Sequence, residues 1–254
     1  MSIKNNLVSI MSVVQNYRLY RSYSNQFKYY LKQLSIKNVP VSGESEYLKK
    51  WSVFTPHVEP YSYRLFSHFM GTDAHIIPED IGHTYIENVL NPLRYRDYYS
   101  DKNLYDERFI SGMLPITFIR RMGDSFLLNA DYGIIENFLE VKDELLSYAC
   151  DQYGHRSDVW NGINFKDNHF VIPNWEKIIE FAKYIGRKNH HCRLLALDIA
   201  IAQDGNPKLI EYNVYAFGFW LFMFQGQKPF GTFTDEIIEY CLKRKNNSKK
   251  IQIV

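Results

Sequence analysis

The stretch RLLALDIAIAQDGNPKLIEYN, residues Arg193 to Asn213, carries the strongest structural signal in the chain. In its first half, leucine and isoleucine residues alternate with smaller or polar ones, which is the two-residue period of a β-strand. The dipeptide Asp204-Gly205 then interrupts the pattern, and Asp-Gly between two strand-like runs is typical of a tight turn. We therefore expect an antiparallel β-hairpin that is closed by a two-residue turn at Asp204-Gly205.

A hairpin with this turn would bring two acidic side chains together. Asp198 would lie directly opposite Glu211, and Asn213 would lie opposite Ala196 on the same face. Two facing carboxylates repel each other, and burial would raise the cost further, but a divalent cation removes both objections. Two carboxylates and an amide oxygen are suitable ligands for Mg²⁺ shared with substrate phosphates. The alternative is that Asp198 and Glu211 are partly exposed residues paired with lysines.

Composition excludes several classes of protein. The chain has 254 residues, of which 46% are hydrophobic, and its net charge is only +2, so a nucleic-acid-binding protein with a clustered basic excess is not expected. The three cysteines are far apart and form no CxxC pair, which predicts neither a disulfide framework nor a zinc site. No apolar run is long enough to span a membrane. We expect a cytoplasmic protein.

The rest of the chain alternates between helical and strand-like patterns. Apolar residues at helical spacing predict helices over residues 7–34, 44–54, 60–70, 134–146 and 173–186. Strands are expected over residues 115–120 and 126–128, and a polar loop over residues 151–170. Residues 75–100 have a strand-and-turn character, with a short helix at 84–90. The aromatic run over residues 217–224 is expected to be core, the alternatives being an acceptor-binding wall or an exposed interface.

The hairpin resembles the metal-binding hairpin of the ATP-grasp superfamily, in which an acidic residue on one strand and Glu-x-Asn on the next hold magnesium ions at nucleotide phosphates. By position, the resemblance assigns Asp198, Glu211 and Asn213 as metal ligands. The Asp-Lys pair at residues 101–102 resembles the one that opens an ATP-grasp domain, which implies that Lys102 contacts a phosphate. Arg193 could also reach the phosphates, or it could pair with Asp151.

Further stretches resemble one bacterial branch of this superfamily, the ATP-grasp proteins associated with sugar transfer in capsule and exopolysaccharide gene clusters. These stretches are EYLKKWSVFTPHVEPYSYRLFSHFMG, IIPEDIG, LNP, YYSDKN and VIPNWEKI. The resemblance implies an α+β chain in which a helical region, residues 1–100, precedes an ATP-grasp-like domain, residues 101–254. It also implies Mg²⁺ and ATP as cofactors, a small carboxylate or sugar as substrate, polysaccharide-biosynthesis enzymes as partners, and ligation of a carboxylate to an amine or hydroxyl.

The sequence departs from this family in one large respect. An ATP-grasp lid needs on the order of 60 residues, judged from ordinary strand and helix lengths, and no such segment separates Lys102 from the hairpin. We place the missing segment near residues 146–147. Lys142 is the nearest candidate for the second phosphate-binding lysine, but its helical EVKDE context favours a solvated side chain. The alternatives to an active ligase are a non-catalytic remnant that binds or scaffolds, and a different magnesium-dependent enzyme.

Overall fold

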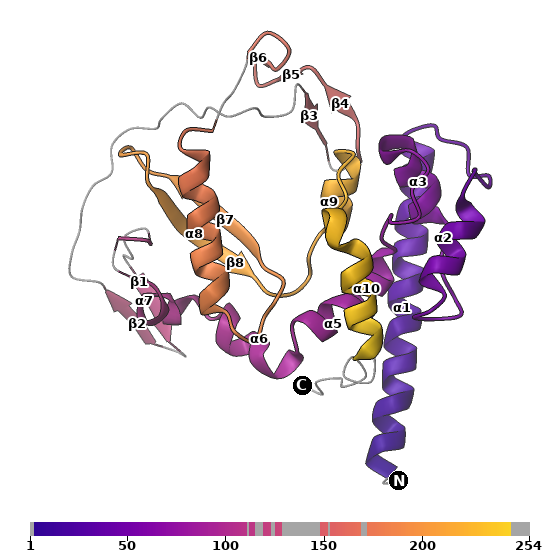
Figure 1. Cartoon of the computed structure of the whole chain (residues 1–254), viewed down its shortest axis with the longest axis horizontal. Helices are drawn as coiled ribbons and strands as arrows, with labels where there is room; N and C mark the ends of the chain where they lie inside the picture. Colours follow the sequence, from indigo (N-terminus) through magenta and orange to yellow (C-terminus); the bar gives the residue numbers. More distant parts are fainter. Residues whose placement is uncertain are drawn as a thin grey trace. The chain divides into compact units, whose positions relative to one another are not determined.

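The computed structural model of the chain describes residues 3–110, 112–114, 119–122, 125–128, 148–151, 153–168 and 172–244. It is a mixed α+β structure, with helices and two-stranded sheets (Figure 1). Its contacts define two compact units: unit 1 consists of Met1–Arg94, Cys150–Ser157 and Tyr215–Val254, and unit 2 consists of Tyr95–Ala149 and Asp158–Val214. The predicted division into residues 1–100 and 101–254 stays a prediction.

Unit 1 is built mainly from helices. The expected helices over residues 7–34, 44–54 and 60–70 are present with slightly different ends, as α1 (Ile3–Gln33), α2 (Glu44–Trp51) and α3 (Tyr61–Met70). Gly71 follows α3 with a φ of 75°, a conformation that glycine adopts without strain, and thereby ends the helix. Later in the chain, α9 (Phe219–Phe224), η3 (Gly231–Phe233) and α10 (Thr234–Lys243) complete the unit.

The short helix expected at residues 84–90 is present within a longer helical run, but the strand-and-turn interpretation of the rest of residues 75–100 is wrong, because most of this segment is helical. It contains α4 (Glu79–Ile81), the π-helical turn η1 (Gly82–Ile86), α5 (Glu87–Leu90) and, at the start of unit 2, α6 (Leu93–Ser100). Pro78 precedes α4 in an extended conformation, and Glu79 and Asp80 occupy its first turn. Ile76 and Ile77, which suggested a strand, lie before this helix and are fully buried, so their apolar character reflects burial in the core.

Aromatic side chains form the centre of unit 1. Phe27 of α1, Trp51 of α2 and Phe66 of α3 are fully buried, and Phe224 of α9 meets Phe66 edge to face with ring centroids 5.1 Å apart. Edge-to-face pairs at this distance add to the stabilisation that burial itself provides. The expectation of a core role for the aromatic run is confirmed for one side of α9, while Phe222 on its other side is 52% exposed.

Five acidic residues are buried in the described part of the same unit, and one of them, Glu44, pairs with Arg64. Glu59 begins α3 by accepting hydrogen bonds from the backbone nitrogens of Tyr61 and Ser62, and Glu87 contacts the ring of His83 at 2.8 Å. Glu79 accepts a hydrogen bond from the backbone nitrogen of Trp220, but among the described residues its second oxygen has no hydrogen-bond partner, and neither does one oxygen of Asp80. Burial, followed by the charge of Glu59, raises the pKa of Asp80 to about 7. Burial also raises the pKa of Glu59 and Glu79.

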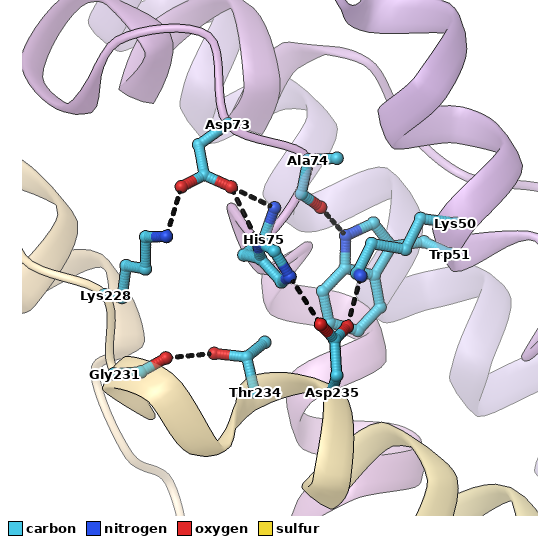
Figure 2. A network of polar contacts seen from close by, with 9 residues as sticks. All are labelled: Lys50, Trp51, Asp73, Ala74, His75, Lys228, Gly231, Thr234 and Asp235. Atoms are coloured by element: carbon cyan, nitrogen blue, oxygen red, sulfur yellow. Dashed lines mark hydrogen bonds and ion pairs between the residues drawn. The ribbon is translucent and has the colours of Figure 1, made fainter.

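A polar network joins α10 to the segment before α4 (Figure 2). The ring of His75 lies between two carboxylates, with Nδ1 2.7 Å from Asp73 and Nε2 3.0 Å from Asp235. A lysine neutralises each carboxylate at its outer side: Lys228 lies 2.6 Å from Asp73, and Lys50 pairs with Asp235. Burial alone would raise the pKa of Asp73, but hydrogen bonds from Lys228 and His75 outweigh it and lower this pKa to about 2.

Unit 2 contains the hairpin, formed by β7 (Ala196–Ile201) and β8 (Pro207–Asn213), and the helix α8 (Trp175–Lys188) that packs against it (Figure 1). The predicted helix over residues 173–186 is thus confirmed with a shift of two residues at each end. Its apolar face joins the hairpin and the segment after α6 in one core. The buried members of this core are Tyr99, Tyr105, Phe109, Phe181, Ile185, Cys192, Leu209, Tyr212 and Val214.

The remaining elements are short. β1 (Ile119–Met122) pairs with β2 (Ser125–Leu128), so the first strand ends later than expected. The segment expected to be a polar loop contains β4 (Arg156–Ser157), which pairs with β3 (Ala149–Cys150), and β5 (Val159–Trp160), which pairs with β6 (Ile163–Asn164). The helix expected over residues 134–146, Lys142, and the proposed junction at residues 146–147 lie outside the described residues.

Candidate metal and phosphate site on the hairpin

The hairpin places the predicted acidic pair face to face. Asp198 of β7 is the register partner of Glu211 of β8, and Ala196 is the partner of Asn213. Because side chains of a strand alternate between its two faces, Asp198, Glu211 and Asn213 lie on one face. The other face carries Leu197, Leu209 and Tyr212 into the core with α8, so the site is held on a packed scaffold while its own side chains face away from that core.

The loop of this hairpin is longer than expected. Gly205 donates a backbone hydrogen bond to Ala202 at 2.8 Å, and Ala202 donates one to Asn206 at 2.9 Å, which encloses three loop residues instead of two. Gly205 has a φ of 74°, the left-handed conformation typical of the last residue in such a loop. The expectation of a two-residue turn at Asp204-Gly205 is therefore wrong.

A β-bulge restores the expected partners nearer the site. Beside the loop, Ile199 pairs with Leu209, but the register shifts by one residue between Asp198 and Ile199, and Ile210 is the extra residue in β8. A bulge of this kind adds one residue to one strand and redirects the side chains that follow it. The added loop residue and the bulge cancel, so Asp198 still meets Glu211.

The two carboxylates differ in their electrostatic environment. Partial burial, and then the negative charge of Glu211, raise the pKa of Asp198, which Lys102 only partly offsets. The pKa of Glu211 is lowered, first by the hydrogen bond from Lys102 and further by hydrogen bonds from Asp198 and Asn213. The hairpin thus holds one firmly ionised carboxylate beside one whose ionisation is opposed by its neighbour.

Lys102, the predicted phosphate ligand, lies at this pair. Its ammonium group forms an ion pair with Glu211, and that contact raises the pKa of the lysine. The lysine side chain is 64% exposed, whereas that of Glu211 is 27% exposed, so the ammonium group reaches the acidic pair from the solvent side. The structure therefore brings together Lys102, Asp198, Glu211 and Asn213, which come from two regions of the sequence about a hundred residues apart.

Lys102 is held in this place by Tyr105 and Arg108, neither of which was predicted as a site residue. Lys102 belongs to the 3₁₀ turn η2 (Lys102–Leu104), which leads into α7 (Tyr105–Arg108). The hydroxyl of Tyr105 accepts a hydrogen bond from the backbone nitrogen of Tyr212 at 3.1 Å, and the two rings stack with centroids 5.0 Å apart. Tyr212 lies between Glu211 and Asn213, so this contact holds the turn that carries Lys102 against β8.

Arg108 strengthens the same connection. Its guanidinium group donates to the carbonyl oxygens of Asp101 at 3.0 Å and Tyr99 at 3.4 Å, and to the hydroxyl of Tyr212. It also lies 5.1 to 5.6 Å from the centres of four tyrosine rings, within the range of a cation–π contact. Tyr105 and Arg108 follow Lys102 at spacings of three residues, but this spacing does not reveal their role, because their partner Tyr212 is distant in the sequence.

Arg193 is the fifth predicted site residue. Arg193 lies three residues before β7 and has an exposed side chain. Its proposed contact with nucleotide phosphates stays a prediction. Asp151, the alternative partner considered for Arg193, accepts hydrogen bonds from the backbone nitrogens of Tyr153 and His155 and pairs with the His155 ring at 2.8 Å.

The donors on the hairpin are chemically suitable for a hard divalent cation but supply only part of its coordination. Two carboxylates and an amide oxygen are oxygen donors of the kind that Mg²⁺ binds. In the described ranges, no group of three or more His, Cys, Asp or Glu side chains could hold a metal ion. A cation on this face would therefore need further oxygen ligands from water or from a phosphate group, as is usual for Mg²⁺.

Comparison of the chain with protein-family models, with curated proteins and with solved structures gives no match. The resemblance to ATP-grasp proteins consequently rests on the motif residues themselves. In the part of the chain that the structure describes, no helix is long and apolar enough to cross a membrane.

Proposed function

We propose that the hairpin binds a divalent cation together with the phosphates of a nucleotide, as in ATP-grasp proteins. The observation that carries this proposal is the pairing of Asp198 with Glu211 on one face of the hairpin, with Lys102 in contact with Glu211. Two facing carboxylates raise the energy of the protein unless a positive charge is near, and a divalent cation supplies more charge than one exposed lysine.

The residues have distinct roles in this proposal. Asp198, Glu211 and Asn213 provide oxygen ligands, and Lys102 is placed to contact a phosphate oxygen that shares the cation. Tyr105 and Arg108 keep the lysine turn beside β8. A bound Mg²⁺ would neutralise the phosphates and polarise the one that is attacked.

The reaction that the resemblance implies is Mg-ATP-dependent ligation of a carboxylate to an amine or hydroxyl in surface polysaccharide assembly. Support for it is limited to the motifs, their order, and the geometry of the hairpin. The competing proposal is a catalytically inactive remnant that binds or scaffolds polysaccharide enzymes. The sequence favours that alternative at one point, because the lid with a second phosphate-binding lysine has no counterpart between Lys102 and the hairpin.

Calorimetric titration of ATP in the presence of Mg²⁺ tests whether the hairpin binds a nucleotide, which the ligase requires and the remnant does not. We expect saturable binding to the wild type, no binding when EDTA replaces Mg²⁺, and none to the Asp198→Asn/Glu211→Gln variant. The matched control is Glu176→Gln/Glu180→Gln, which removes two exposed carboxylates from α8 of the same unit and should bind as the wild type does.

The outcomes separate the candidate functions. Binding followed by release of ADP when small carboxylates and amines are added would support the ligase. Binding without ADP release from any such mixture would support the remnant. A folded wild type that binds no Mg-ATP would refute nucleotide binding at the hairpin, whatever the variants do.

A further inference from the structure

The ammonium group of Lys102 occupies an oxygen that a cation on the hairpin would use. It contacts Oε2 of Glu211, one of the two facing carboxylates, as both an ion pair and a hydrogen bond. This contact is the first cause of the lowered pKa of Glu211, and the charge of the lysine also acts on Asp198. Lys102 is therefore the counter-ion of the acidic pair.

The side chain of Lys102 can move while its backbone is held. Because this side chain is 64% exposed, little packing restrains it, and its flexible stem can carry the ammonium group to a new partner. The turn behind it is fixed to β8 by the hydrogen bond between the hydroxyl of Tyr105 and the backbone N–H of Tyr212. The lysine can thus leave Glu211 without any rearrangement of the hairpin.

The charges at the pair favour either the lysine or a free divalent cation, but not both. Ionised Asp198 and Glu211 carry two negative charges, and Lys102 cancels one of them. A divalent cation added beside the lysine would make the total positive and would meet a like charge at Glu211. Phosphates reverse this balance, because they add negative charge and accept strong hydrogen bonds from an ammonium group.

We propose that Lys102 couples cation binding to phosphate binding by competing with the cation for Glu211. While no phosphate is present, the ammonium group stays on Glu211 and opposes a divalent cation at the pair. A nucleotide offers the ammonium group another partner, and Glu211 then becomes available as a metal ligand. Such coupling rests on the proposed function and deepens it, because the hairpin then selects the cation–nucleotide complex over the free cation.

Titration with Mn²⁺ alone, followed by the electron paramagnetic resonance of the unbound ion, tests the competition. Mn²⁺ prefers the same carboxylate, carbonyl and water ligands as Mg²⁺, and its binding is observed without any activity. Lys102→Met removes the charge but keeps a long side chain. We expect this variant to bind Mn²⁺ about five to ten times more tightly than the wild type, in the lower range of coupling between two ligands because the lysine is exposed. Lys102→Arg keeps the charge and should bind Mn²⁺ as the wild type does.

The matched control is Lys183→Met in α8. Lys183 is 56% exposed and pairs with Glu180, so this change also removes a lysine from an exposed ion pair of unit 2, and it should leave Mn²⁺ binding unchanged. A second readout uses ATP together with Mn²⁺. Lys102→Met should bind this complex more weakly than the wild type, although it binds the free ion more tightly. General loosening of the fold would weaken both, so opposite changes identify the competition.

The outcomes distinguish this coupling from the proposed function itself. Equal Mn²⁺ affinities of the wild type and Lys102→Met, or no Mn²⁺ binding by either, would refute the competition, whereas nucleotide binding is judged on the wild type with Mg-ATP. A gain in Mn²⁺ affinity that disappears in Lys102→Met/Glu211→Gln would support the competition and place the ion at the hairpin. A gain that survives the Glu211→Gln change would place the ion elsewhere and overturn the proposal.

Discussion

At the scale of single residues, Asp198 is the position where a binding function and stability oppose each other. Its pKa is raised by partial burial and by the charge of Glu211, so its ionised form is unfavourable in the protein without a bound cation. A residue that costs stability in this way is typical of a binding site. The ionised form of Glu211 is already stabilised by the hydrogen bond from Lys102, which lowers its pKa, so Glu211 reduces stability less than Asp198 does.

We predict that Asp198→Asn stabilises the protein when no divalent cation is present. The gain should be less than about 1 kcal/mol, because the pair is accessible to solvent. With Mg-ATP at about a hundred times its dissociation constant, the wild type should gain about 2.7 kcal/mol and the variant should gain nothing. Thermal unfolding with and without Mg-ATP measures both effects.

The control for this measurement is Glu180→Gln, which removes an exposed carboxylate from α8 and should leave both responses unchanged. A variant that is less stable than the wild type without cation would contradict the electrostatic account of Asp198. Equal stabilisation of wild type and variant by Mg-ATP would place the nucleotide elsewhere.

At the scale of elements, the contact between α7 and β8 decides where Lys102 lies. The hydroxyl of Tyr105 accepts a hydrogen bond from the backbone N–H of Tyr212, and both residues are buried. We predict that Tyr105→Phe costs roughly 1 to 3 kcal/mol of stability, because it leaves a buried N–H without a partner. The same change should weaken Mg-ATP binding about threefold to tenfold by loosening the position of Lys102.

A double-mutant cycle with Lys102→Ala separates positioning from general loosening. If Tyr105 acts through the lysine, Tyr105→Phe should not weaken nucleotide binding further in the Lys102→Ala background. The control is Tyr98→Phe, which removes the hydroxyl of a tyrosine that is 54% exposed. Additive losses of affinity would show that Tyr105 supports the fold but not the lysine.

The same elements show what the sequence could and could not predict. Alternation of apolar residues identified both strands of the hairpin, and the acidic pair was found although the loop was predicted one residue too short. That success depended on the bulge at Ile210, which the sequence pattern does not reveal because an isoleucine fits a regular strand equally well. Tyr105 and Arg108 were missed because their partner, Tyr212, becomes adjacent only in the folded protein.

Helix starts gave a different lesson. In residues 75–100 the apolar pair Ile76-Ile77 suggested a strand, whereas Pro78 followed by Glu79 and Asp80 begins a helix. Local signals at a helix N-terminus were therefore more informative here than two neighbouring β-branched residues. The burial of Glu79 and Asp80 had no signal in the sequence, since acidic residues in a first turn are normally solvated.

At the scale of the molecule, unit 1 contains two groups of acids whose effects on stability change with pH in opposite directions. Asp80 has a pKa of about 7 in the folded protein, above the value of about 3.9 expected when unfolded. Between these pH values the folded state retains a proton that the unfolded state has lost, so the free energy of unfolding falls as pH rises toward 7. Burial also raises the pKa of Glu59 and Glu79, so these two residues likewise lower the free energy of unfolding as pH rises.

Asp73 in the network of Figure 2 acts in the other direction. Its folded pKa of about 2 lies below the unfolded value, so its contribution is present above about pH 4 and is lost as pH falls toward 2. The pKa of Asp235 is lowered too, first by Lys50 and then by His75. We therefore expect unit 1 to be most stable at about pH 4 to 5 and to lose stability on both sides.

Asp80→Asn tests the alkaline side of this profile. The amide cannot ionise, so at pH 8 the variant should be more stable than the wild type by roughly 4 kcal/mol, which is about 1.4 kcal/mol for each pKa unit of the shift, and the difference should vanish near pH 4. Urea unfolding followed by tryptophan fluorescence measures the profile within unit 1 when Trp160, Trp175 and Trp220 are replaced by phenylalanine, so that the buried Trp51 alone is observed. The exposed Glu46→Gln change in α2 should leave the profile as it is. If the free energy of unfolding of the wild type and of Asp80→Asn changed in parallel from pH 4 to 8, Asp80 would be solvated. Burial and the charge of Glu59 would then not raise its pKa.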